Sequence, residues 1–192
     1  MPRIPALPAS KVGFFTRVLY RLSRRRFGAV PEPFAVLAHH PKLLRTMAMF
    51  EQQLLGAARR LPASLRDLVV YRVATQVGCS WCVDFGTMLQ RLQGLDVERL
   101  AELDSYHDSP RFTELERAAL AYADAMTAQP PRVDDEMVAH LDRELGHDGL
   151  VELTVMIAVE NMRARCYNAL GITDQGFTSG DACSVPPSHR TP

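Results

Sequence analysis

The chain has 192 residues, of which 47% are hydrophobic and 23% are charged, and its 22 basic and 22 acidic residues give a formal net charge of zero. This composition predicts one globular domain with a sizeable core and excludes an intrinsically disordered chain. The balanced charge gives no indication of a nucleic-acid partner.

The first part of the chain is strongly basic. An apolar run over residues 12–22 is interrupted by Arg17 and Arg21, and it is too short for a membrane span or a signal-peptide core. A basic amphipathic helix at this place can contact an anionic membrane or a partner, or it can fold back onto the domain, and the sequence leaves these alternatives open. The basic residues that precede the first acidic residue, Glu32, are Arg3, Lys11, Arg17, Arg21, Arg24, Arg25 and Arg26.

Apolar residues recur at spacings of three and four along nearly the whole chain, and no stretch alternates strictly with period two. We therefore predict an all-α protein, a compact multi-helix bundle. Residues 1–172 are expected to form a single domain, and the glycines, prolines and small polar residues of 173–192 indicate an irregular tail. The predicted helices are 11–26, 41–58, 62–77, 80–93, 96–104, 112–128, 133–145 and 147–170.

The last predicted helix is apolar nearly all round between residues 150 and 159, so we expect it to be the buried centre of the bundle. Polar side chains gather near its end, where a subunit interface or the edge of a pocket would supply their partners. They are Glu160, Asn161, Arg165 and Asn168.

The sequence Cys79-Ser80-Trp81-Cys82 is the strongest functional signal in the chain. Gly78 suits the left-handed conformation that ends a helix, and a new helix is expected to begin at about Ser80. The two cysteines then lie at the amino-terminal end of a helix, where unpaired N–H groups and the macrodipole favour a thiolate. Two cysteines at this spacing can form and open a disulfide.

Three kinds of chemistry are compatible with this pair, and redox chemistry is favoured. Four cysteines are too few for a disulfide-built secreted scaffold, so we expect a cytoplasmic protein, in which a CxxC is more often catalytic or metal-binding than structural. A zinc site needs four ligands, and neither Cys166 and Cys183 nor the six histidines provide a second closely spaced pair. The third alternative is a pair of inert thiols in the core.

The residue context resembles a known family. Leu65-Arg66-Asp67-Leu68 through Gly78-Cys79-Ser80-Trp81-Cys82 is similar to the core of the carboxymuconolactone decarboxylase superfamily, in its alkylhydroperoxidase D-like branch. That branch has an acidic residue twelve positions before the first cysteine, then a glycine, the CxxC, and a histidine four positions after the second cysteine. The clear part of the resemblance covers residues 41–95.

The resemblance implies a helical fold assembled as a homo-oligomer, such as a trimer, hexamer or dimer, and a thiol peroxidase that needs no metal, flavin or haem. Cys82 would attack a hydroperoxide and become a sulfenic acid, and Cys79 would condense with it to a disulfide. A dithiol or protein-thiol reductant would then regenerate the pair. Asp67 takes the position of the usual glutamate and is the candidate base.

One departure from the branch is marked: Gly86 stands where the histidine is expected. Residues i and i+4 share a helix face, so the place beside Cys82 is expected to be empty. Trp81 can shield the disulfide, form a pocket wall or belong to the core. Asp84 is a possible support, although it points about 200° away from Cys82 and a solvated carboxylate is the simpler interpretation. Tyr71 is expected to pack or to line the pocket, and Arg72 to lie at the surface.

Two rival functions stay open on the sequence. The first is a redox-sensing or interaction protein without efficient turnover, which the loss of the histidine favours. The second is a lactone decarboxylase-like enzyme of the wider superfamily, whose chemistry does not use a CxxC.

Overall fold

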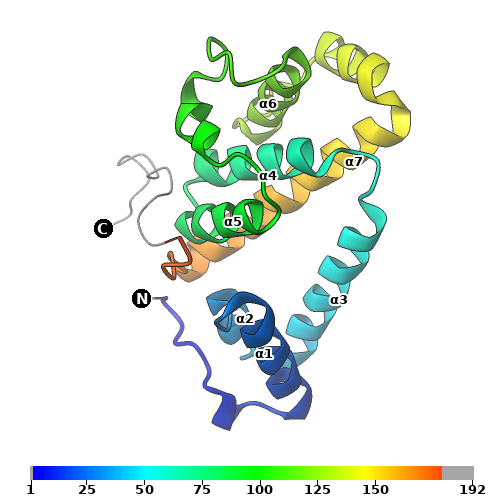
Figure 1. The fold of residues 1–192 in the computed structure, drawn as a ribbon. Helices are drawn as coiled ribbons and strands as arrows, with labels where there is room; N and C mark the ends of the chain where they lie inside the picture. The colour runs from blue at the N-terminus through cyan, green and yellow to red at the C-terminus, as the bar shows by residue number, and fades with distance from the viewer. Residues whose placement is uncertain (1, 179–192) are drawn as a thin grey trace.

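The computed structural model describes residues 2–178, which contain helices, turns and irregular segments and no β-strand (Figure 1). The prediction of an all-α fold is therefore confirmed. In chain order, the elements are the 3-10 helix η1 (Ala9–Lys11), the α-helices α1 (Phe14–Phe27), α2 (Glu32–Leu37), α3 (Pro41–Ala57), α4 (Ala63–Val77) and α5 (Ser80–Leu92), the 3-10 helix η2 (Glu98–Ser105), and the α-helices α6 (Glu114–Thr127) and α7 (Asp135–Leu170).

The predicted helices differ from the observed ones in three places. Helix α2 was not predicted, because Pro33 was interpreted as a break although proline is tolerated in a first turn, where it lies here. The predicted helix 96–104 is a 3-10 helix. The last two predicted helices are one element, α7, with a kink at Gly146 (φ 70°, ψ 167°) at the predicted break.

Helix α4 is the centre of the fold, packed against α5, α6 and α7. It buries residues on two faces. Leu68 and Tyr71 face a cluster that includes both cysteines and Trp81. Leu65 and Val73 face a second cluster with residues of α6 and α7. The start of α5 therefore packs against α4, which other helices cover on several sides.

Helix α7 is not buried all round, contrary to the expectation from its sequence. Leu153 and Ile157 lie in the core, but Val151 is 62% exposed, and Val155 and Met162 are also exposed. The helix is apolar on every side between residues 150 and 159, yet α4 and α6 cover only part of its circumference. One apolar stripe is therefore left at the surface.

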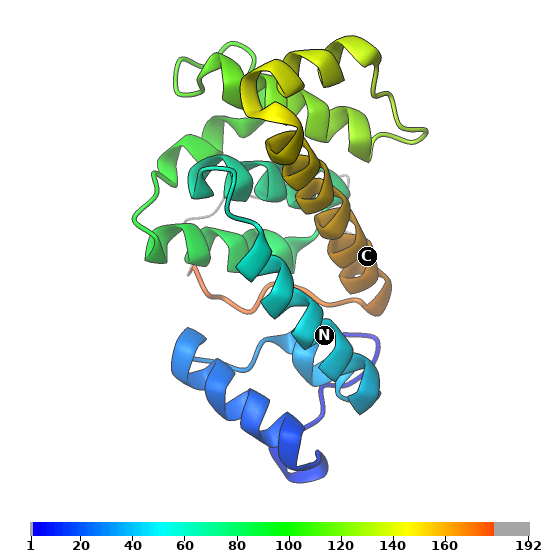
Figure 2. The same ribbon diagram turned by 90° about the vertical axis from the view of Figure 1, so that its right-hand side faces the viewer.

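Helices α1 and α2 and the start of α3 form a separate lobe at the end of the molecule opposite α6 (Figures 1 and 2). The lobe has its own apolar cluster, to which Tyr20 and Leu44 belong. Helix α3 leads from the lobe to the core, and Arg163 of α7 holds its second half through an ion pair with Glu51. The ring of Phe27 also meets Phe85 of α5 edge-on, with centroids 5.1 Å apart.

Candidate active site

The cysteine pair lies at the junction of α4 and α5. Gly78 closes α4 in the left-handed conformation (φ 74°, ψ 33°), and Cys79 is the N-cap of α5. The backbone N–H of Cys82 donates to Cys79 Sγ at 3.2 Å, and a disulfide joins the two residues. The predicted position of the pair at a helix start is confirmed.

The two sulfur-bearing residues differ in their access to solvent. Cys79 is completely buried, whereas Cys82 is 8% exposed. A reagent that approaches from outside therefore meets Cys82 first. The N-cap position gives Cys79 the closer contact with the helix macrodipole, which favours a thiolate.

Trp81 is a buried residue of the same core cluster as both cysteines. Its ring stacks on Phe85 with centroids 4.6 Å apart, and it meets Tyr167 edge-on at 5.4 Å. The indole Nε1 donates to Gln175 Oε1 at 2.8 Å. An indole N–H in a buried place needs such a partner, so Trp81 is held firmly beside the pair.

Asp84 is not a solvated carboxylate: it is 5% exposed, and the expectation from the sequence is wrong. Its two oxygens accept hydrogen bonds from the backbone N–H groups of Gln175, Phe177 and Thr178 at 2.9 to 3.0 Å, and from the Thr178 hydroxyl at 2.8 Å. These donors lie more than 90 positions away in the sequence. Asp84 thus anchors the C-terminal strap, by which we mean residues 174–178.

The strap also connects α5 with the amino-terminal lobe. The Gln175 amide accepts from the backbone N–H of Glu32 at 2.7 Å and donates to the Val30 carbonyl at 3.2 Å. The ring of Phe177 meets Phe85 edge-on. The strap is irregular, as predicted for the chain after residue 172, while the predicted end of the domain at 172 stays a prediction.

The place beside Cys82 is not empty. Tyr71 is buried, and its Cδ2 lies 3.4 Å from the position that a Cβ would take at Gly86. The Tyr71 hydroxyl lies 3.3 Å from Thr87 Oγ1. An aromatic ring from α4 therefore contacts the place that the missing side chain would take, and Tyr71 packs in the core.

Asp67, the candidate base, lies one turn before Tyr71 on α4. Its carboxylate pairs with Arg66 Nε at 2.9 Å, and both side chains are largely buried. Its role as a base stays a prediction.

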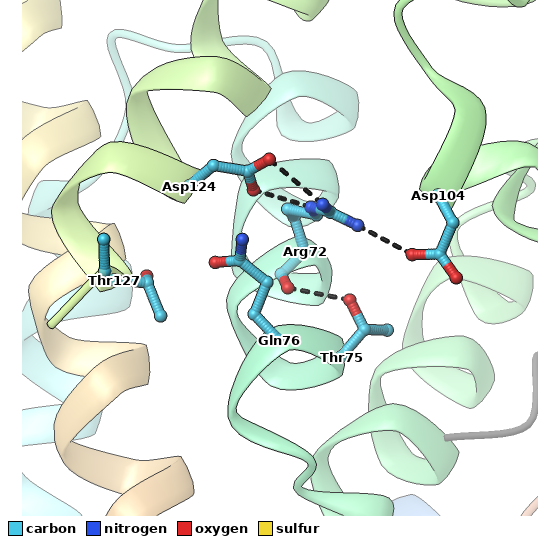
Figure 3. A pocket seen from close by; sticks show the side chains of 7 residues that line it. Arg72, Thr75, Gln76, Asp104, Asp124 and Thr127 are labelled. Atoms are coloured by element: carbon cyan, nitrogen blue, oxygen red, sulfur yellow. Dashed lines mark hydrogen bonds and ion pairs between the residues drawn. The ribbon is translucent and has the colours of Figure 1, made fainter. Parts of the chain in front are cut away.

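Arg72 is not a surface residue: its side chain is only 12% exposed. Figure 3 shows its guanidinium between two carboxylates. Nε and Nη2 donate to Asp124 at 2.6 and 3.0 Å, and Nη1 donates to Asp104 at 2.9 Å. Burial lowers the pKa of Arg72, but the hydrogen bonds and charge of both carboxylates outweigh it and the pKa is raised.

A polar cavity of about 390 Å³ opens beside this ion pair (Figure 3). The Arg72 guanidinium already donates to Asp104 and Asp124. The buried Gln76 Oε1 has no hydrogen-bond partner among the described residues. An arginine among the apolar residues 68–74 of α4 was the one sequence signal for this cluster. The cavity is lined by Arg72, Thr75, Gln76, Asp104, Asp124, Thr127 and Ala128.

A second buried ionic cluster joins α7 to α3. Arg163 Nη1 lies 3.1 Å from Glu160, and Arg163 also pairs with Glu51. Burial raises the pKa of Glu160 to about 7, although the Arg163 charge opposes this shift. Burial likewise raises the pKa of Tyr167, which packs against Trp81. Tyr167 therefore lies between this ionic cluster and Trp81, which packs beside the cysteine pair.

The other polar residues late in α7 have structural partners. Asn161 Nδ2 donates to Thr127 Oγ1 at 2.9 Å, and Asn168 Nδ2 donates to the Val77 carbonyl at 2.8 Å. Arg165 Nη2 donates to Asn161 Oδ1 at 3.3 Å. These bonds tie α7 to α6 and to the end of α4, directly before the cysteine pair.

The remaining candidates lie apart from the pair. Cys166 is an exposed free thiol. Within residues 2–178, no group of three or more His, Cys, Asp or Glu side chains is arranged to hold a metal ion. In the same range no helix is both long and apolar enough to cross a bilayer. Cys183 and His189 lie outside the described residues.

Comparison with known proteins places the chain among its relatives. A family model described as the carboxymuconolactone decarboxylase family matches residues 41–125. The uncharacterized protein YnjA of Escherichia coli is 31% identical over 179 residues, which cover 93% of this chain and 96% of that protein. Alkyl hydroperoxide reductase Rv2159c of Mycobacterium tuberculosis is 33% identical over 87 residues, 44% of this chain and 24% of that protein.

Solved structures agree with the fold. A peroxidase-related protein with an alkylhydroperoxidase AhpD core, from Ralstonia eutropha, superposes with a TM-score of 0.79 at 20% identity and covers 92% of this chain and 94% of that chain. The debrominase Bmp8 superposes with a TM-score of 0.77 at 19% identity and covers 90% of this chain and 91% of its own. With its AhpD-like helical fold and its CxxC pair at the start of α5, the chain belongs to the carboxymuconolactone decarboxylase family.

Proposed function

We propose that this protein is a thiol oxidoreductase that reduces hydroperoxides through Cys79 and Cys82 without a cofactor. The observation that carries the proposal is the disulfide between these two residues at the N-terminus of α5. It is the oxidised product that a two-cysteine peroxidase must form in each cycle. The relative named alkyl hydroperoxide reductase supports the same chemistry.

The proposed cycle starts from the reduced pair. The Cys82 thiolate attacks a peroxide oxygen of ROOH, the O–O bond breaks, and the alkoxide takes a proton to leave as ROH, with a sulfenic acid on Cys82. The Cys79 thiolate attacks this sulfur, hydroxide leaves and is protonated to water, and the disulfide forms. A dithiol then reduces the disulfide by exchange and becomes a disulfide itself.

Residue roles in this cycle follow access and position. Cys82 is the more exposed of the two, which supports it as the residue that meets the peroxide. Cys79 is buried directly beneath it and is the resolving residue. Asp67 is the proposed base, and Trp81 forms a wall next to the pair. A cytoplasmic location with a thiol reductant completes the proposal.

Homo-oligomerisation is part of the same proposal. Val151, Val155 and Met162 are exposed at spacings of four and seven on one side of α7, which is the pattern of a helix that packs against a partner. Light scattering on the purified protein, compared with a Val155→Asp variant, tests this assembly. A trimer, hexamer or dimer that the substitution dissociates is the expected result.

One experiment separates an enzyme from a sensor. Reduced protein receives one equivalent of cumene hydroperoxide, and free thiols are titrated before and after. The loss of two thiols, with a disulfide in the peptide that contains Cys79 and Cys82, is expected. Steady consumption of peroxide in the presence of a dithiol supports the enzyme, whereas oxidation without turnover supports the redox sensor, which the absence of an imidazole at Gly86 favours. Oxidation confined to Cys166 or Cys183 would overturn both.

A further inference from the structure

Helix α1 turns hydroxyl-bearing side chains inward and several apolar side chains to solvent, whereas a surface helix usually buries its apolar face. The side chains that it turns inward are Thr16, Tyr20 and Ser23, which recur at spacings of four and three. Several of its apolar residues face outward: Phe14 is 72% exposed, Phe15 is 74% exposed, and Val18 and Leu22 are also exposed. A helix that buries hydroxyl groups and leaves phenylalanines in solvent has an outer face that something else must cover.

The inward orientation of α1 is well determined. The Tyr20 hydroxyl donates to the Leu7 carbonyl at 3.1 Å, and Tyr20 belongs to the apolar cluster of the amino-terminal lobe. Ser23 Oγ donates to the Leu19 carbonyl in the preceding turn at 2.9 Å. A rotation of the helix that buried its phenylalanines would break the Tyr20 bond and its packing.

The exposed apolar residues of α1 line a groove of about 700 Å³ against α3. The groove belongs to the lobe at the end of the molecule opposite α6 (Figure 2). Its walls are mostly apolar, and Lys42 and Arg45 of α3 lie along it. The main apolar lining residues are Phe14, Phe15, Val18, Leu22, Ala48 and Met49.

Positive charge surrounds this face. No acidic residue occurs before Glu32, and the exposed side of α1 carries arginines between and beyond its apolar residues. Two copies of this face would bring the same cations together, so like charges disfavour its self-association. The exposed arginines of α1 are Arg17, Arg21, Arg24, Arg25 and Arg26.

We propose that the outer face of α1, together with its groove against α3, docks the protein on the surface of an anionic lipid bilayer. Helices with aromatic and aliphatic residues on one side and a dense set of arginines beside them bind at the headgroup boundary without crossing the membrane. Phe14, Phe15 and Leu22 enter the boundary, and the arginines meet the anionic headgroups. This inference goes beyond the proposed peroxidase function and does not depend on it.

The end of α1 contacts the cysteine-bearing helix. Phe27, the last residue of α1, meets Phe85 of α5, and Phe85 stacks on Trp81 between the two cysteines.

Vesicle binding tests the inference with the full chain. The protein is sedimented with vesicles of phosphatidylcholine alone and with vesicles that also contain phosphatidylglycerol. Partitioning onto the anionic vesicles is expected to be stronger by at least about tenfold, and to weaken as salt is added. Equal partitioning onto both vesicles, or none onto either, would overturn the proposal.

Two sets of variants assign the binding to this face. Arg21→Gln, Arg24→Gln and Arg25→Gln together are expected to lower partitioning by roughly fivefold for each charge removed. Phe14→Ser with Phe15→Ser is expected to lower it at any salt concentration. All five side chains are exposed, so the fold is retained, which circular dichroism checks.

The matched controls are Leu92→Ser and Arg143→Gln, which change an exposed apolar residue and an exposed arginine outside α1 and α3. They are expected to leave partitioning unchanged. If the phenylalanine variant instead alters the mass of the protein in solution while vesicle binding stays the same, the face is an interface between copies and the inference is wrong.

Discussion

The ring of Tyr71 lies against Gly86, with Cδ2 at 3.4 Å from the position of a Cβ on that residue. This contact brings α4 and α5 together one turn beyond Cys82. It shows why a glycine is compatible with this position of the family motif. The aromatic ring of Tyr71 therefore lies where a side chain at position 86 would begin.

The effect of a substitution at Gly86 on stability should depend on the size of the new side chain. Gly86→Ala is expected to stabilise the protein by up to about 1 kcal/mol, because alanine favours the helix and its Cβ meets Tyr71 at an ordinary contact distance. Gly86→His must displace the Tyr71 ring and is expected to destabilise by about 1 to 3 kcal/mol. Urea unfolding measures both. Gly56→His, at a glycine of α3 whose Cβ would meet nothing within 4 Å, is the control. A Gly86→His protein with unchanged stability and faster peroxide turnover would contradict the packing argument.

Asp84→Asn should release the C-terminal strap. The asparagine side chain has only one acceptor oxygen, so some of the four donors that Asp84 now satisfies lose their partner, at a cost of about 1 to 3 kcal/mol. Trp81 is the only tryptophan, so its fluorescence reports directly on the loss of the bond to Gln175. A red-shifted emission is expected. Asp174→Asn, an exposed strap residue, is the matched control, and identical spectra for all three proteins would refute the anchor.

Glu160 should make stability depend on pH. Its pKa is about 7 in the folded protein and near 4.3 when unfolded, so the folded state binds more protons between these values. The stability that the neutral carboxyl contributes is complete below about pH 4 and is lost as the pH rises through 7, by about 3 to 4 kcal/mol.

Glu160→Gln is expected to remove this loss, because the amide stays neutral and can still accept from Arg163. Unfolding by urea at intervals from pH 5 to pH 8 measures the difference between the two proteins. Glu144→Gln, at an exposed position of α7, should follow the wild type. Parallel pH profiles for wild type and Glu160→Gln would show that Glu160 does not titrate in this range.

The two cysteines should differ in their products with peroxide. Cys82→Ser is expected to abolish the reaction, because the attacking thiolate is gone. Cys79→Ser should leave a sulfenic acid on Cys82 that a dimedone reagent traps, because no resolving thiol is present. Mass spectrometry of the labelled peptide identifies the residue. Trapping at Cys79 in the Cys82→Ser protein, and none in the reverse variant, would exchange the roles in favour of the residue nearer the helix dipole.

Features that depend on neighbours along the chain could be predicted from the sequence. Gly78 ends α4 in the left-handed conformation, and the cysteine pair starts the next helix, because both depend on local backbone preferences. The periodicity of apolar residues likewise predicted the all-α class, since it reflects only the geometry of each helix.

Contacts between residues that are distant in the sequence were decided by the tertiary structure alone. Asp84 is buried because a segment more than 90 positions later supplies its donors, and Arg72 is buried because Asp124, 52 positions away, neutralises it. Charged residues are expected at the surface unless they are paired, and one sequence does not reveal which distant groups pair. The apolar stripe of α7 has the same origin. The pattern of apolar residues shows which faces of a helix can be buried, and the helices packed around it determine which of those faces is buried.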